Sequence, residues 1–204
     1  MPMRTLMLAL MFFAQAQTYP PPYPRPGTTK ILENDRVIVW NVSWLKQAYP
    51  VHRHVYDYAG VYYTSGDRII VSEQGTRSPT RSVAWDTFVL PRGITHSEEG
   101  ASDEPLRGVF LEFKEPQPLG TVDARTSPPA FPGTAGKQVR DGDRVTIWEL
   151  APAPGGSAPH LHTRDAVVVA IAGLKPRVTY VARGTVHNDE QVAGADRVFA
   201  FEVK

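Results

Sequence analysis

The feature that most limits how this chain can fold is an internal repeat. The segment DRVIVW at residues 35–40 matches DRVTIW at residues 143–148, an offset of 108 residues. Without a gap, the same offset aligns four further pairs of identical residues: His52 with His160, His54 with His162, Asp57 with Asp165 and Val61 with Val169. Matches in register over such a length indicate a duplication, so we expect two similar structural units.

The second copy is shorter than the first. LPRGITH at residues 90–96 matches VARGTVH at residues 181–187 with an offset of 91, so the second copy lacks 17 residues (108 less 91). The missing piece falls within residues 65–86, where a turn at 65–67, a β-rich run and a turn near Gly75 are typical of one hairpin. We therefore expect the second unit to lack that hairpin.

Both copies have the pattern of all-β structure. Runs such as residues 36–42, 166–171 and 177–181 are short, rich in β-branched or aromatic residues, and separated by turns. The 204 residues include 19 prolines and 16 glycines, and no long stretch has the 3.6-residue period of a helix. Each copy ends in a strand, at residues 108–114 and 197–204. Several short strands per unit predict a sandwich or a small barrel.

Composition divides the chain further. We expect a signal peptide at 1–16, a Pro-rich arm at 17–30, a first domain at 31–114, a Pro/Gly-rich linker at 115–137 and a shortened second domain at 138–204. In the signal peptide, Arg4 precedes a short apolar run, and Ala14-Gln15-Ala16 fits an A-x-A cleavage site. Cleavage after Ala16 predicts a periplasmic or secreted protein without a membrane anchor. The alternative, a buried N-terminal helix, is disfavoured by the prolines that follow.

Charge and cysteine content exclude several classes of function. The formal net charge is +1, from 22 basic and 21 acidic residues, which does not favour nucleic acid or a membrane surface as partner. The chain has no cysteine, so disulfides and thiolate chemistry are excluded. We expect a small-molecule ligand. The sequence does not decide between a monomer and a homo-oligomer.

All six histidines of the chain fall into two matched triads. The first is His52, His54 and His96, and the second is His160, His162 and His187. Residues two apart on a strand point to the same face, so each H-x-H pair converges, and the third histidine completes the cluster. Three imidazoles that leave coordination positions open suit a divalent transition metal, whether Fe, Mn, Zn, Ni or Cu. The alternative is a hydrogen-bonded cluster that holds no ion. The case for this alternative is stronger for the second triad than for the first.

Two sets of residues near the first pair leave alternatives open. Strand parity turns Asp57 away from His54. We therefore favour an ion pair of Asp57, and of its repeat partner Asp165, with Arg36 or Arg144. The alternative is that these aspartates lie near the metal. The same parity points Tyr58 and Tyr62 toward the metal side, although aromatic residues on strands usually pack in the core.

The motifs resemble those of the cupin superfamily, and the chain resembles a two-domain cupin, or bicupin. The H-x-H pairs match the first cupin motif, and PRGITH at residues 91–96 matches P-x-G-x2-H of the second; ARGTVH at 182–187 matches it except for Ala182. The resemblance implies two tandem jelly-roll barrels (double-stranded β-helices), the second shortened. The glutamate ligand of the family is missing, because Tyr58 and Ala166 stand in its place. This implies a metal site of three histidines.

Together with the signal-peptide pattern, which predicts export, the resemblance implies an exported metal-binding bicupin. The first expectation is a metal-dependent enzyme of dioxygenase, isomerase or decarboxylase type, acting on a small organic acid or a similar oxygen-rich molecule. In such an enzyme Tyr58 and Glu98 are the catalytic candidates, and Glu99 is another by its position after His96. The alternatives are a non-catalytic module that binds metal or a small ligand, and a structural protein with vestigial pockets.

Overall fold

The computed structural model describes residues 18–115, 122, 127–131, 136–151, 158–188, 192 and 194–204. These residues form sixteen β-strands and no α-helix, so the all-β prediction is confirmed. Within the described ranges, no helix is long and apolar enough to cross a membrane. The predicted signal peptide, residues 1–16, lies outside the described residues.

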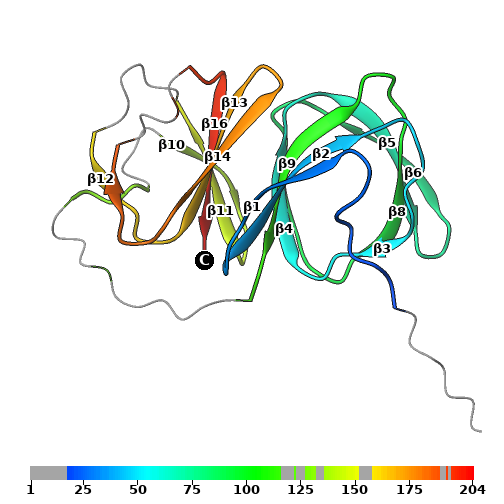
Figure 1. The fold of residues 1–204 in the computed structure, drawn as a ribbon, viewed down its shortest axis with the longest axis horizontal. Coiled ribbons are helices and arrows are strands. Elements are labelled where there is room, and N and C mark those ends of the chain that lie inside the picture. The colour runs from blue at the N-terminus through cyan, green and yellow to red at the C-terminus, as the bar shows by residue number, and fades with distance from the viewer. Residues whose placement is uncertain are drawn as a thin grey trace, which may run out of the picture.

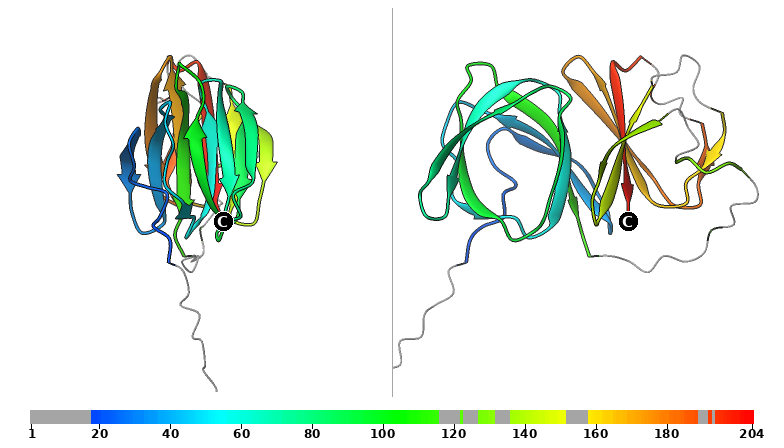
Figure 2. Two further views of the ribbon diagram at one scale, coloured as in Figure 1. Left: turned by 90° about the vertical axis from the view of Figure 1, so that its right-hand side faces the viewer. Right: turned by 180° about the vertical axis from the view of Figure 1, so that it is seen from behind.

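The first half of the chain, residues 18–115, folds into two antiparallel sheets that enclose a barrel (Figure 2, right). The five-stranded sheet has the order β1 (Thr28–Glu33), β2 (Val37–Trp44), β9 (Leu106–Phe113), β4 (Asp57–Tyr62) and β7 (Thr87–Leu90). The four-stranded sheet has the order β3 (His52–Arg53), β8 (Thr95–Gly100), β5 (Gly66–Ser72) and β6 (Arg77–Ser82).

The second half, residues 127–204, repeats only part of this pattern. Its five-stranded sheet has the equivalent order β10 (Gly136–Asp141), β11 (Val145–Leu150), β16 (Arg197–Val203), β13 (Ala166–Ala172) and β14 (Lys175–Val181). Facing it is a two-stranded sheet of β12 (His160–Leu161) and β15 (Val186–His187). β13 turns directly into β14 at Gly173, whose φ of +58° favours glycine, so the β5–β6 hairpin has no counterpart there. The predicted shortening is confirmed.

The two five-stranded sheets pack face to face, with the largest apolar core between them (Figure 1). Side chains alternate along β2, so Val37 and Val39 enter this shared core whereas Trp40 and Trp44 point into the first barrel. The second half contributes eight buried residues to the shared core: Val145, Ile147, Val167, Val169, Ile171, Phe199, Phe201 and Val203. Each half therefore covers an apolar sheet face of the other.

Ion pairs cross between the halves at this shared core. Arg36 of the first half donates from Nε to Asp165 Oδ2 of the second at 2.9 Å. Conversely, Arg144 of the second half pairs with Asp57 Oδ2 of the first at 3.2 Å. The prediction that the repeated aspartates pair with these arginines is confirmed. The reciprocal arrangement gives the two halves a pseudo-twofold relation, as in a symmetric dimer.

The repeat extends beyond the boundaries predicted from sequence, into the arm before β1 and the segment before β10. The carbonyl of Pro20 accepts a hydrogen bond from the Arg53 amide at 2.9 Å, and Pro128 accepts one from the Leu161 amide at 2.8 Å. Tyr23 packs on Trp40 with ring centroids 5.3 Å apart, as Phe131 does on Trp148 at 5.0 Å. All four pairs of equivalent residues are 108 positions apart. Part of the predicted linker is therefore the arm of the second half.

Candidate metal centre

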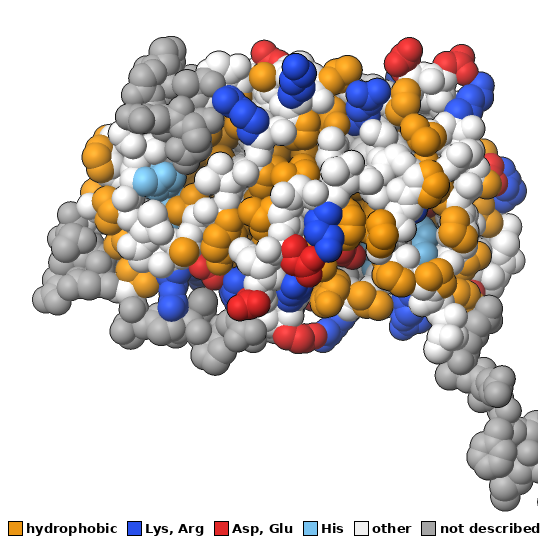
Figure 3. All heavy atoms as spheres, in the orientation of Figure 1, with side chains coloured by type: hydrophobic (Ala, Val, Ile, Leu, Met, Phe, Trp, Pro, Cys, Tyr) orange, Lys and Arg blue, Asp and Glu red, His pale blue; other side chains and the backbone are white. Residues whose placement is uncertain are grey.

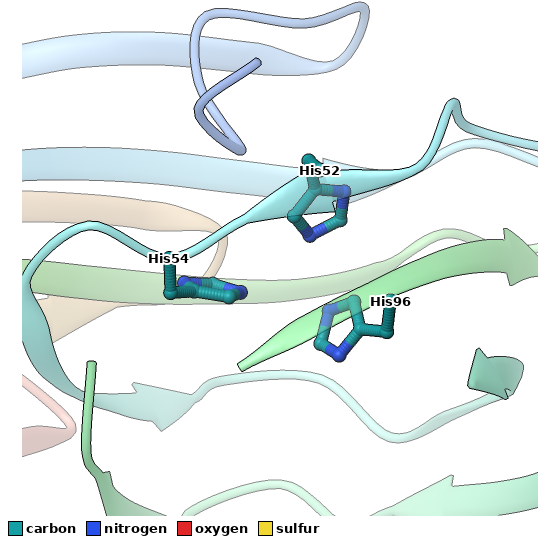
Figure 4. A group of neighbouring side chains, drawn as sticks. All are labelled: His52, His54 and His96. Carbon is teal, nitrogen blue, oxygen red and sulfur yellow. The ribbon is translucent and has the colours of Figure 1, made fainter. Parts of the chain in front are cut away.

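The first histidine triad converges inside the first barrel. His52 lies on β3 directly opposite His96 of β8, and His54 follows β3 on the same side. One ring nitrogen of each histidine lies within 4.8 Å of the others, and the three rings face one another (Figure 4). All three side chains are buried. The structure therefore brings together the three residues that the sequence selected.

The buried ring nitrogens fit a metal ion. A carbonyl can only accept, so the 3.1 Å contact of His52 Nδ1 with Pro50 O places the proton on Nδ1 and leaves Nε2 with a lone pair. His52 Nε2, His54 Nδ1 and His96 Nε2 have no hydrogen-bond partner among the described residues. Burial lowers the pKa of His52 to about 4 and that of His54 to about 3, so these imidazoles are neutral at pH 7.

A cavity of about 180 Å³ lies beside the triad. His54 and His96 line it, as do the predicted Tyr58 and Tyr62. The Tyr58 ring stacks on His54, with centroids 4.0 Å apart and planes 6° from parallel. Burial raises the pKa of the Tyr58 hydroxyl, which therefore stays protonated at neutral pH and can donate a hydrogen bond. The Tyr58 side chain thus orients one imidazole of the triad.

Glu98 forms a buried polar cluster at one end of the cavity. Its Oε2 lies 2.7 Å from Arg25 Nη1, and its Oε1 lies 3.0 Å from Arg68 Nη1 and 4.0 Å from His96 Nε2. Trp44 Nε1 donates to Oε2 at 3.0 Å. Burial by itself raises the pKa of Glu98, but the charges of Arg25 and Arg68 outweigh burial and hold the pKa at about 2.

Glu99 does not reach the cavity. It forms a two-pronged ion pair with Arg77 of β6, at 2.6 and 2.7 Å, because successive residues of β8 point to opposite faces. Two residues that do reach the Glu98 cluster, Arg25 and Arg68, were not selected from the sequence. Tyr23, which also lines the cavity, had a detectable signal in its match with Phe131 at the 108-residue offset.

The second triad has the same layout with different surroundings. His160 and His187 lie opposite each other on β12 and β15, and the candidate nitrogens of all three histidines lie within 4.8 Å of one another. His162 Nε2 and His187 Nε2 are 3.0 Å apart. Where the first half has Tyr58 and Tyr62, the second has alanines, Ala166 and Ala170. Histidine side chains are visible in both halves in Figure 3, at the left and at the right.

Comparisons with known proteins connect this fold to solved structures. No family model matches the chain, and no curated protein does. AerE from Microcystis aeruginosa is 14% identical, with a TM-score of 0.60 over 92% of this chain and 99% of that one. A cupin domain from Bordetella pertussis Tohama I is 26% identical over 46% of this chain and 99% of that one, with a TM-score of 0.41. Nearly the whole two-unit arrangement is therefore shared with a solved protein.

Proposed function

We propose that this chain, which folds as two tandem cupin barrels with the second one shortened, is a metal-dependent protein. It would act on a small organic acid or a similar oxygen-rich molecule. One observation carries the proposal: three buried, neutral histidines converge beside a cavity, and one ring nitrogen of each has no hydrogen-bond partner among the described residues. Buried polar nitrogens without partners are costly, and a bound cation removes that cost.

The first triad would hold one divalent transition metal through His52, His54 and His96. Three imidazole ligands leave coordination positions open to a ligand in the cavity, and a metal bound there supplies Lewis-acid or redox chemistry. Imidazole suits Fe, Mn, Zn, Ni and Cu alike, so the donor set does not choose among them. The second triad offers the same donors, and we propose it as a weaker metal site.

The remaining residues of the first cavity orient and enclose the ligand. The Pro50 carbonyl fixes the tautomer of His52, and the Tyr58 ring holds the plane of His54. Glu98 is a weak base, since two arginines hold its pKa at about 2, so its role is to position Arg68 rather than to abstract a proton.

The weak basicity of Glu98 also favours a second candidate function, a binding module without turnover. Such a module would hold metal, or a small ligand through metal, and release it unchanged. Oxygen uptake and product formation with a panel of small organic acids distinguish the two functions. Turnover that disappears in His52→Gln supports the enzyme, whereas binding without turnover supports the module.

Metal analysis of the purified full chain tests the metal site itself. We expect about one equivalent of a transition metal in the first barrel, lost in His52→Gln and retained in the matched second-barrel variant His160→Gln. Metal content is measured by plasma mass spectrometry and by titration of the chelator-treated protein. Less than about a tenth of an equivalent, with no binding on titration, overturns the proposal.

Export is a further part of the proposed function. It rests on the signal-peptide pattern of residues 1–16, which predicts a mature chain that begins at Gln17. Intact mass measurement of the protein from a periplasmic or culture-medium fraction tests this. A mass that includes Met1, found only in the cytoplasmic fraction, contradicts export.

A further inference from the structure

At one end of the first cavity, Arg68 contacts Glu98. Arg68 lies on β5 and lines the cavity. Its Nη1 contacts Glu98 Oε1 at 3.0 Å, and its Nη2 donates to the Tyr62 hydroxyl at 2.6 Å. Its Nε has no partner among the described residues, so the guanidinium keeps unused donor capacity.

Positive charge exceeds negative charge at this end of the cavity. The side chains of Arg25 and Arg68 are only 5% and 14% exposed, and among the described residues Glu98 is the carboxylate that pairs with both. Glu112, another buried carboxylate of this barrel, instead accepts a hydrogen bond from Trp40 Nε1 at 2.7 Å and does not line the cavity. Buried charge without a counter-charge is unfavourable, so this end favours an anionic group.

The cavity limits the size and character of that anion. Its volume of about 180 Å³ is the space of roughly six water molecules, which is enough for a short-chain acid but too small for a nucleotide. Phe88, Phe110 and Ile70 form apolar walls that suit a hydrocarbon portion. Arg68 Nη1 and His96 Nε2 lie 3.0 Å and 4.0 Å from the same atom, Glu98 Oε1, so the two nitrogens are at most 7.0 Å apart (3.0 plus 4.0). A small acid can span that distance.

We propose that the first cavity binds a small monocarboxylate whose carboxylate group is held by Arg68 and whose other end faces the histidine triad. This inference rests on the proposed function and narrows it to acids of this class. An arginine fork matches the two oxygens of a carboxylate, which makes Arg68 the residue that distinguishes acids from neutral analogues.

The second barrel supplies a natural contrast. Arg68 belongs to the β5–β6 hairpin, which has no counterpart between β13 and β14. At the repeat positions of Arg25 and Tyr62 the chain has Gly133 and Ala170. The recognition of acids is therefore a property of the first barrel alone, even if both triads bind metal.

Calorimetric titration of the full, metal-loaded chain with propanoate and pyruvate, against propanamide as the neutral analogue, tests the inference. We expect the acids to bind the wild type and Arg81→Gln equally, because Arg81 pairs with Asp67 at the surface of the same hairpin. Arg68→Gln is expected to weaken acid binding by about tenfold or more, and Arg68→Lys by less. Tyr62→Phe, which removes only the hydroxyl that holds Arg68, is a milder second variant.

Three outcomes overturn the inference: no acid binds the wild type, propanamide binds as tightly as propanoate, or acids bind as tightly to Arg68→Gln and Tyr62→Phe as to the wild type. Metal content of the Arg68 variants is measured in parallel and is expected to be unchanged. Acid binding that depends on Arg68 in a chain that takes up no metal would sink the proposed metal function and leave this inference standing.

Discussion

Asp57 and Asp165 occupy equivalent positions but differ in burial, which predicts unequal effects of the same substitution. The Asp165–Arg36 pair has side chains 12% and 9% exposed, against 21% and 16% for Asp57–Arg144. Removing one partner of a buried pair leaves a charge uncompensated. We expect Asp165→Asn to lower the free energy of unfolding by about 3 kcal/mol and Asp57→Asn by about 1 kcal/mol. Urea denaturation measures both, and equal losses would contradict the burial argument.

The depressed pKa values of the first triad predict that the metal-free protein loses stability in mild acid. Unfolded histidine titrates near pH 6.5, whereas burial lowers the pKa of folded His52 to about 4 and of His54 to about 3. Between these values only the unfolded chain takes up protons on these histidines. The free energy of unfolding is therefore highest above pH 6.5 and decreases as the pH falls toward 4.

For the chelator-treated chain we expect the free energy of unfolding to fall by about 5 kcal/mol between pH 7 and pH 4.5, about half of it from each of His52 and His54. The comparison is with the double variant His52→Gln/His54→Gln, which lacks both groups and should show a smaller decrease. Urea midpoints at several pH values provide the measurement. A pH dependence that is the same in both proteins would rule out the triad as its source.

At single residues, the sequence predicted the histidines but not their charged neighbours. His52, His54 and His96 were identifiable because a short motif fixes two of them on one strand face and the repeat marks the third. Arg68 and Arg25 lie 28 and 71 positions from His96 and belong to no motif that links them to it. Only the closure of the barrel and the entry of the arm bring them to Glu98.

Among the elements, the arm before β1 is a structural part of the first barrel. Tyr23 is buried against Trp40, whereas Tyr19 of the same arm makes an exposed hydrogen bond to Glu73. We expect Tyr23→Ala to lower the free energy of unfolding by about 3 kcal/mol, because it leaves a space in the barrel core. Tyr19→Ala is the matched control, with a loss below about 1 kcal/mol in the same denaturation experiment. Similar small losses in both variants would show that the arm is not part of the core.

Most elements were predictable, and the arms were not, for a physical reason. Strands and the lost hairpin leave a strong trace in sequence, because burial on one face imposes alternation and turns require particular residues. A proline-rich arm has no such period and bonds through its backbone, as Pro20 and Pro128 do. Its repetition is visible in the PP dipeptide, in the aromatic residue that follows, Tyr23 or Phe131, and in the proline after it, Pro24 or Pro132.

At the scale of the whole molecule, the shared core predicts that the two halves unfold together. Phe201 of the second half is fully buried among residues of both sheets. We expect Phe201→Ala to cost about 3–5 kcal/mol and to reduce amide protection in β2 and β9 of the first half as well. Hydrogen exchange followed by mass spectrometry measures this, with Leu174→Ala in the exposed β13–β14 turn as control. Two separate transitions, with first-half protection unchanged, would contradict a single cooperative unit.

The duplicated arm also decides where one unit of this molecule stops and the next starts. Residues 127–131 already belong to the second barrel, since Pro128 and Ala130 bond to Leu161 and Phe131 covers Trp148. The stretch that separates the two units is therefore residues 116–126 at most, and not the whole of 115–137. The natural place to divide this chain is before residue 127 and not at the start of β10.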